Sequence, residues 1–149
     1  MVTHRTDNHI VSDMIIDCWE NEPDVSTELL QKTFIGTPHI AGYSADGKAN
    51  ATRAMITAVT DRLQIKIDLS TIQPPQPENP IIALPGTEQD FSQAVWTTYD
   101  PIKDSLALKK APETFEQLRS CYPLRREFCA YALQPDSEAR KFEAWGFSS

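Results

Sequence analysis

The sequence predicts an α/β chain in two parts, and three features of its 149 residues indicate this. A short apolar run within 11–19 is flanked by polar residues, as in a buried strand that ends in a loop. A longer helical pattern follows over 46–63. Residues 73–80 then hold four prolines in eight positions, which exclude a continuing helix and mark a linker. We therefore expect one part over 1–72 and a second over 73–149.

The first part has a helical pattern on either side of a loop. Ser26 is a candidate N-cap for a short helix over 27–32, because its hydroxyl can accept from a first-turn amide. A brief strand at 34–35 leads into the loop 36–44, where two glycines and a proline surround His39. The face of the longer helix is defined by apolar residues at four-residue spacing, Met55, Val59 and Leu63, with Ala51, Ala54 and Ala58 beside them.

The second part mixes short helices with few strands, which is typical of an α+β unit. We expect strands at 81–84 and 127–133. Gly146 is suited to end the last helix, since glycine readily adopts the backbone conformation found after a helix C-terminus. The expected helices cover 88–99, 105–110, 114–122 and 137–145.

Charge and hydropathy argue against two classes of partner. A net charge of -7 without a cluster of Lys and Arg is unlike a nucleic-acid-binding surface. The apolar runs, such as 80–84, are far shorter than the ~20 residues of a membrane-spanning helix. Residues 1–8 show no secretory signal, so we expect a cytoplasmic protein. Three cysteines without a CxxC pair predict reduced core thiols and no zinc site.

Two segments carry the candidates for chemistry. Residues 16–23 read Ile-Asp-Cys-Trp-Glu-Asn-Glu-Pro, and residues 37–43 read Thr-Pro-His-Ile-Ala-Gly-Tyr. In this order they resemble the Asp-x-aromatic-x-x-Glu-Pro and Pro-His-x-x-Gly motifs of the D-isomer-specific 2-hydroxyacid dehydrogenases. The resemblance implies that 1–72 is the C-terminal remnant of a Rossmann-like NAD-binding domain with a long return helix, and that 73–149 is a small α+β dimerisation domain.

The resemblance also implies a role for each candidate residue. Oxidation of a 2-hydroxy acid passes hydride to NAD while the hydroxyl proton leaves, and a histidine can take that proton near neutral pH. His39 matches this general acid/base, and Glu22 matches the carboxylate that orients it. Asp17 matches a contact of the nicotinamide end of NAD, and Gly42 a close approach of backbone to the cofactor. Tyr43 matches a substrate contact in one branch of the family, but it could equally cover the next helix. No metal is implied.

Segments outside the two motifs resemble that same branch. They are the loop at 39–48, the stretch 115–128 and the closing residues 145–147. The branch oxidises 4-phospho-D-erythronate to its 2-oxo acid in pyridoxal 5'-phosphate synthesis. The resemblance thus implies a phosphorylated 2-hydroxy acid as substrate and a homodimer through 73–149, in which exposed aromatic residues such as Trp96, Tyr99 or Phe128 could take part.

Two parts of the family's machinery have no counterpart in the sequence. Its five glycines form no GxGxxG turn, and the arginine that binds the substrate carboxylate would fall before Met1. We therefore expect a fragment that binds NAD weakly and is inactive alone. Two alternatives stay open, a non-catalytic self-association module and a dehydrogenase of another 2-hydroxy acid. Lys48 and Arg53 are only candidates for a phosphate contact.

Overall fold

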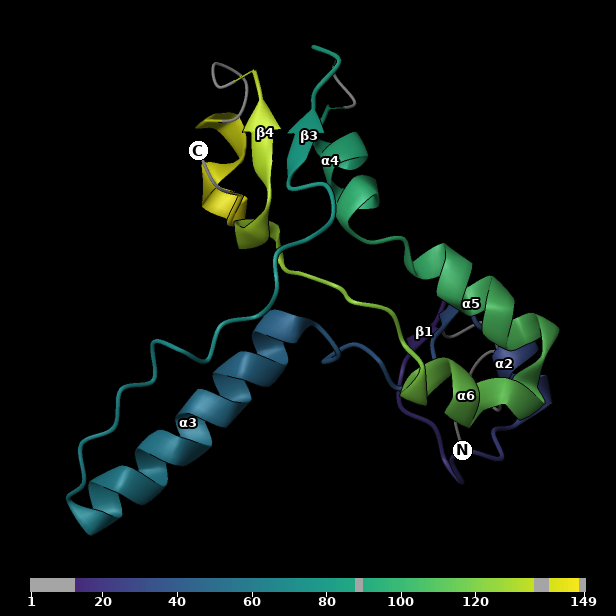
Figure 1. The fold of residues 1–149 in the computed structure, drawn as a ribbon. Helices are drawn as coiled ribbons and strands as arrows, with labels where there is room; N and C mark the ends of the chain where they lie inside the picture. The colour runs from purple at the N-terminus through teal and green to yellow at the C-terminus, as the bar shows by residue number, and fades with distance from the viewer. Residues whose placement is uncertain (1–12, 88–89, 136–139, 148–149) are drawn as a thin grey trace. The chain divides into compact units, whose positions relative to one another are not determined.

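The chain forms two compact units from interleaved segments in a computed structural model that describes residues 13–87, 90–135 and 140–147. Unit 1 combines 1–41 with 100–123, and unit 2 combines 42–99 with 124–149. Both units contain helices and a small parallel sheet (Figure 1), which confirms the predicted mixture of helix and strand. The division at residue 72 and the assignment of its two sides to a Rossmann remnant and a dimerisation domain stay predictions.

The described residues of unit 1 form a small sheet and three α-helices. Strands β1 (Ile15–Ile16) and β2 (Ile35–Gly36) pair in parallel, and helix α2 (Thr27–Lys32) connects them in the sequence. Helix α2 has the predicted bounds, because the Ser26 hydroxyl accepts from the N–H of Leu29 at 3.2 Å. The strand expected within 11–19 is only two residues long, although 11–12 lie outside the described residues. The other helices are α5 (Pro101–Lys110) and α6 (Phe115–Ser120), preceded by the 3-10 turn η1 (Pro112–Thr114).

The core of unit 1 fixes where β2 lies. Gly36 donates its N–H to the Ser105 hydroxyl at 3.0 Å, which ties the strand to helix α5. A Cβ on Gly36 would lie 2.7 Å from Leu30 and 2.9 Å from the Trp19 ring, so only glycine permits this packing. The buried residues of this core are Trp19, Val25, Leu30, Leu108 and Phe115.

Helix α5 is longer than the sequence predicted. It begins at Pro101, not near 105, because the Asp100 carboxylate accepts from the N–H of Ile102 at 3.1 Å and caps the helix. Proline at the first helical position fits this start, since its missing N–H would have no partner inside the helix.

Unit 2 contains the long helix α3 (Ala45–Leu63) and a second parallel pair, β3 (Ile81–Ala83) with β4 (Ala132–Gln134). Helix α4 (Asp90–Thr98) and the 3-10 segment η3 (Arg140–Trp145) complete its core, whose buried residues are Ile82, Leu84, Ala94, Leu133 and Phe147. Gly146, with φ +96°, follows η3 as predicted.

Two predictions for unit 2 are wrong in part. The strand expected over 127–133 is shorter, because the 3-10 turn η2 (Phe128–Ala130) occupies its first half. The expected final α-helix is a 3-10 helix in its described part, while 136–139 lie outside the described residues, as do 88–89 of the helix expected to start at 88. Alternating apolar residues fit both a strand and a tight turn that is held by core contacts, so sequence alone does not separate them.

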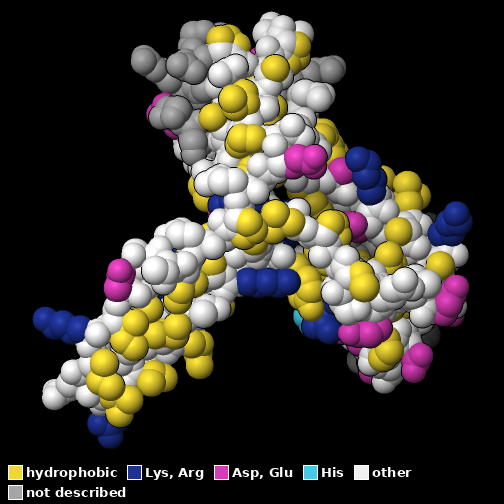
Figure 2. Space-filling view, in the orientation of Figure 1, with side chains coloured by type: hydrophobic (Ala, Val, Ile, Leu, Met, Phe, Trp, Pro, Cys, Tyr) yellow, Lys and Arg dark blue, Asp and Glu magenta, His cyan; other side chains and the backbone are white. Residues whose placement is uncertain are grey.

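Helix α3 starts one residue before the predicted 46–63 and ends as predicted, but its environment is unexpected. Ser44 caps its start by accepting from the N–H of Gly47 at 3.0 Å. Its apolar face is exposed: the exposed fractions of Met55, Val59 and Leu63 are 68%, 53% and 61%. Figure 2 shows apolar side chains gathered along this helix. The pattern identified one face of the helix, but the described residues do not cover that face.

A buried ion pair holds the start of α3. The Arg126 guanidinium donates to the Asp46 carboxylate from Nε at 2.8 Å and from Nη2 at 3.0 Å. Asp46 also accepts from the N–H of Glu127 at 2.8 Å, and Arg126 donates to the Pro75 carbonyl. These bonds join the helix, the proline-rich linker and the segment before η2 within unit 2.

Two further predictions can be compared with the fold. No helix in the described part of the chain is long and apolar enough to cross a membrane. The cysteines Cys18, Cys121 and Cys129 are reduced, as expected, but all three are exposed, so the prediction of core thiols is wrong.

Candidate active site

His39 and Glu22, which the sequence motifs single out, lie in direct contact in unit 1. The His39 Nδ1 atom is 2.8 Å from Glu22 Oε2, although the two residues are 17 positions apart in the chain. The His39 side chain is 43% exposed and that of Glu22 is 22% exposed. No hydrogen bond to the other ring nitrogen of His39, Nε2, is found among the residues that the structure describes. The arrangement leaves one nitrogen bonded to a carboxylate and the other accessible for proton transfer.

The Glu22 carboxylate is held in its charged form. Burial raises the pKa of Glu22, but the N–H of Trp19, which donates to Oε1 at 2.7 Å, and the His39 ring together lower that pKa below its ordinary value. Arg119 adds a smaller electrostatic contribution in the same direction. An ionised carboxylate can only accept hydrogen bonds, so the proton between Glu22 and His39 resides on Nδ1.

Asp17 accepts hydrogen bonds from loop residues on both sides of His39. Its Oδ1 accepts from the Thr37 hydroxyl at 2.7 Å and from the N–H of Ile40 at 2.7 Å, and its Oδ2 accepts from the N–H of Ala41 at 3.1 Å. Between these bonds His39 has φ 56°, a left-handed conformation uncommon for residues other than glycine. The carboxylate thus stabilises a strained backbone at His39.

Two residues of the site were not singled out by the sequence. The Thr37 carbonyl accepts from the N–H of His39 at 3.0 Å and from the indole Nε1–H of Trp19 at 2.8 Å. The motif indicated only that position 19 is aromatic, and it carried no signal for a hydrogen bond from the ring. This contact depends on how the core of unit 1 orients the indole.

Gly42 and Tyr43 belong to unit 2, whereas Asp17, Glu22 and His39 belong to unit 1. A Cβ on Gly42 would meet no described atom within 4 Å, so the packing of the chain itself does not require glycine there. The Lys48 ammonium lies 4.0 Å from the centre of the Tyr43 ring, a cation–π contact with the first turns of α3. This contact fits the alternative that Tyr43 covers the helix that follows it. The cofactor role of Gly42 and the substrate role of Tyr43 stay predictions.

The two candidate phosphate contacts also have partners within unit 2. Besides the contact of Lys48, the Arg53 guanidinium donates to the Ile72 carbonyl and, at 2.5 Å, to the Asn50 side chain. Among the described residues, no group of three or more His, Cys, Asp or Glu side chains could hold a metal ion.

The residues present suit one end of a nicotinamide cofactor. A carboxylate has about four acceptor positions. The loop occupies three on Asp17, and the Cys18 thiol, 4.0 Å from Oδ2, is a weak fourth donor, so a carboxamide at Oδ2 would take the place of the thiol. The pyrophosphate end needs a glycine-rich turn at a helix start, and the sequence contains no such turn. The contact of Asp17 with the nicotinamide end of a cofactor stays a prediction.

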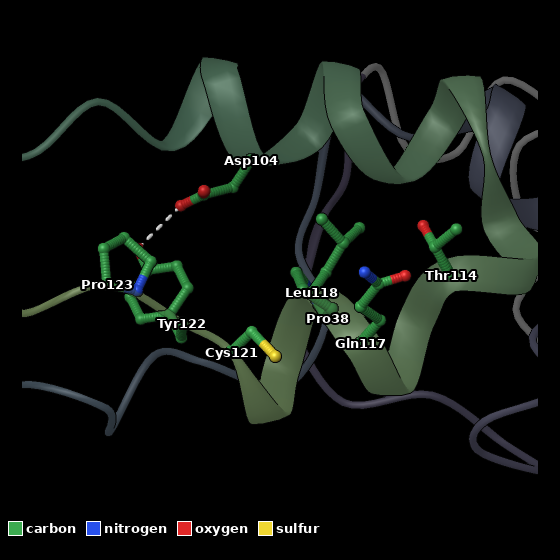
Figure 3. A pocket seen from close by; sticks show the side chains of 8 residues that line it. All are labelled: Pro38, Asp104, Thr114, Gln117, Leu118, Cys121, Tyr122 and Pro123. Carbon is green, nitrogen blue, oxygen red and sulfur yellow. Dashed lines mark hydrogen bonds between the residues drawn. The ribbon is translucent and has the colours of Figure 1, made fainter.

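Two cavities lie in unit 1, apart from the candidate pair. One of about 360 Å³ is bordered by Pro38, next to His39, and by Asp104 and Tyr122, whose hydroxyl donates to the carboxylate at 2.8 Å (Figure 3). The other, of about 770 Å³, lies along β1, where Ile15 is 71% exposed. Neither described lining includes Glu22 or His39.

Comparison with known proteins finds similarity over most of the chain. Residues 75–146 match the family described as "Domain of unknown function (DUF3410)". The chain is 52% identical over 124 residues to an erythronate-4-phosphate dehydrogenase of Bacteroides fragilis, a match that covers 83% of this chain and 34% of that protein. Relatives with the same name are 50% identical in Bacteroides thetaiotaomicron, over 85% of this chain and 35% of the relative, and 42% identical in Porphyromonas gingivalis, over 80% and 33%.

The extent of these matches defines the relationship. The chain spans about a third of the length of the curated relatives it matches. The match covers most of this chain and the C-terminal part of each relative. The chain is therefore a relative of the erythronate-4-phosphate dehydrogenases that corresponds to their C-terminal third.

Proposed function

We propose that this chain supplies the acid/base pair of an NAD-dependent dehydrogenase that oxidises 4-phospho-D-erythronate to its 2-oxo acid. The reaction would serve pyridoxal 5'-phosphate synthesis in the cytoplasm. The observation that carries the proposal is the 2.8 Å contact between Glu22 and His39, which leaves Nε2 available. The names of the relatives support the substrate.

The geometry suggests how the pair would act. His39 Nε2 takes the proton of the substrate C2 hydroxyl, and the ring becomes an imidazolium. The ionised Glu22 keeps the proton on Nδ1 beforehand and stabilises the positive ring afterwards, as the buried carboxylate of a catalytic triad does. A bound NAD would supply the acceptor for the hydride that leaves C2. Asp17 keeps the loop in the conformation that presents His39 and could hold the nicotinamide carboxamide.

We further propose that the chain acts as part of a longer enzyme and is inactive alone. The pyrophosphate-binding turn and the substrate-binding arginine have no counterpart in the sequence. The test compares the chain with a chimera in which it replaces the C-terminal third of the Bacteroides fragilis relative. Calorimetry should detect NAD binding, and absorbance should detect NADH formation, with the chimera and not with the chain.

Other outcomes of this experiment decide between the alternatives. Micromolar NAD binding by the chain alone would contradict its dependence on the missing parts. A chimera that binds NAD but leaves 4-phospho-D-erythronate unchanged would contradict the proposed substrate. If that chimera oxidised another 2-hydroxy acid, the substrate and not the reaction class would be wrong.

A second candidate function is self-association through residues 73–149. Several large apolar side chains there are exposed, including Trp96 at 48% and Leu124 at 55%, whereas Tyr99 and Phe128 are partly buried. We expect the chain to sediment as a dimer and Trp96→Gln to weaken that dimer at least tenfold. Phe34→Gln, at a side chain that is 60% exposed and lies outside residues 73–149, should leave the dimer unchanged. A monomer at high micromolar concentration would contradict this role.

A further inference from the structure

Trp19 is hydrogen-bonded to Glu22 directly and to the backbone of His39 through the Thr37 carbonyl. Its backbone N–H donates to Glu22 Oε1 at 2.7 Å, while Oε2 of the same carboxylate contacts His39 Nδ1. Its indole N–H donates at 2.8 Å to the Thr37 carbonyl, the atom that also accepts from the backbone N–H of His39. The four residues thus close a ring of hydrogen bonds, and Trp19 is its one member in the hydrophobic core of unit 1.

The core leaves the Trp19 ring little freedom. The side chain is buried at 8% exposure, in a cluster with Leu30, Leu108 and Phe115. A Cβ on Gly36 would meet the ring at 2.9 Å, so β2 packs directly against the indole. A buried N–H that lacks an acceptor destabilises the fold, so the bond from the Trp19 indole to the Thr37 carbonyl is favoured. The position of the Thr37 carbonyl, and with it the backbone of His39, follows from core packing.

We propose that Trp19 is a positioning residue that fixes Glu22 and His39 against one another, through its backbone N–H and its indole N–H. This inference rests on the proposed function, in which the pair performs proton transfer. The family motif requires an aromatic residue at this position, but phenylalanine and tyrosine have no ring N–H. The bond to Thr37 is thus a property of tryptophan in this chain.

The test uses the full chain without substrate and measures the His39 tautomer and the titration of Glu22. In the wild type, ¹⁵N NMR should show His39 with its proton on Nδ1, and His39→Gln identifies its signals among the three histidines. Trp19→Phe retains an aromatic side chain and removes the N–H. We expect this variant to shift His39 toward the Nε2–H tautomer. We also expect it to raise the titration midpoint of the Glu22 carboxyl toward its ordinary value. Both changes would follow because the lost bond from the Trp19 indole to the Thr37 carbonyl no longer holds His39 beside Glu22.

A matched control separates positioning from stability. Phe115→Leu removes packing from the same core but removes no hydrogen bond of the ring, so it should lower stability without moving the His39 tautomer. If Trp19→Phe fails to fold, benzothienylalanine at position 19 removes the N–H and retains the bicyclic shape. Unchanged His39 and Glu22 signals in the folded variant, or equal changes in Phe115→Leu, would overturn the inference.

The same spectra separate this inference from the proposed function. A wild-type His39 without the Nδ1–H signature would mean that the pair itself is not formed, which contradicts both. A wild type with the signature and a Trp19→Phe variant that retains it would contradict the role of Trp19 alone. The proposed dehydrogenase chemistry would remain supported in that case.

Discussion

Replacement of His39 by glutamine in the chimera is expected to lower kcat by about 10²- to 10⁴-fold, the usual contribution of general acid/base catalysis. NAD affinity should change little, because His39 acts on the substrate proton. Glu22→Gln should lose about 10²-fold or more, since an amide can hydrogen-bond to the ring but cannot stabilise the imidazolium. Initial rates of NADH formation at saturating NAD measure both effects.

The chain offers a matched control for this pair. Glu20 is an exposed carboxylate two residues from Glu22, and in the described part of the chain it forms no hydrogen bond or ion pair with His39. Glu20→Gln should therefore retain the kcat of the unmodified chimera. A His39→Gln chimera with kcat within tenfold of the parent would remove His39 from the chemistry. Equal losses in Glu20→Gln and Glu22→Gln would indicate a general effect of charge.

Removal of the Asp46 carboxylate is expected to be the most damaging single change to unit 2. The side chains of Arg126 and Asp46 are only 7% and 13% exposed, so Asp46→Ala leaves a buried guanidinium without its counter-charge. Loss of one partner of a buried pair costs about 3–5 kcal/mol. Urea unfolding at neutral pH, followed by circular dichroism, measures the change.

Two variants test the electrostatic explanation. Asp61→Ala removes an exposed carboxylate from the same helix and should change stability by less than about 0.5 kcal/mol. The double variant Asp46→Leu, Arg126→Met removes both charges and should be more stable than Asp46→Ala, because no charge remains buried and unpaired. If the double variant is as unstable as Asp46→Ala, the loss of stability comes from packing and not from an unpaired charge.

The same ion pair predicts a pH dependence of stability. The hydrogen bonds from Arg126 lower the pKa of Asp46 below its ordinary value against the effect of burial, and the N–H of Glu127 adds to this. A group whose pKa is lower in the folded state stabilises the fold above its unfolded pKa, which is about 3.9 for Asp. That contribution is lost as pH falls through the folded pKa. Asp46→Ala should show a weaker acid dependence than the wild type.

The sequence by itself determined those features that depend on near neighbours. Helix α2 has the predicted bounds and α3 starts one residue early, because Ser26 and Ser44 cap them through bonds that span three residues. Glu22 and His39 were recognisable because a motif records residue types at fixed spacing, and the fold brings the two side chains together. These features need only local geometry or a known pattern.

The tertiary structure alone decided which distant groups meet. Asp46 and Arg126 are 80 positions apart, and nothing in the sequence indicated that they form an ion pair. The same holds for the indole of Trp19 and the Thr37 carbonyl, 18 positions apart. Periodicity likewise identified the apolar face of α3 but not its exposure. Local propensities act over a few residues, whereas burial and long-range hydrogen bonds depend on the path of the whole chain, which is why the structure was needed to reveal them.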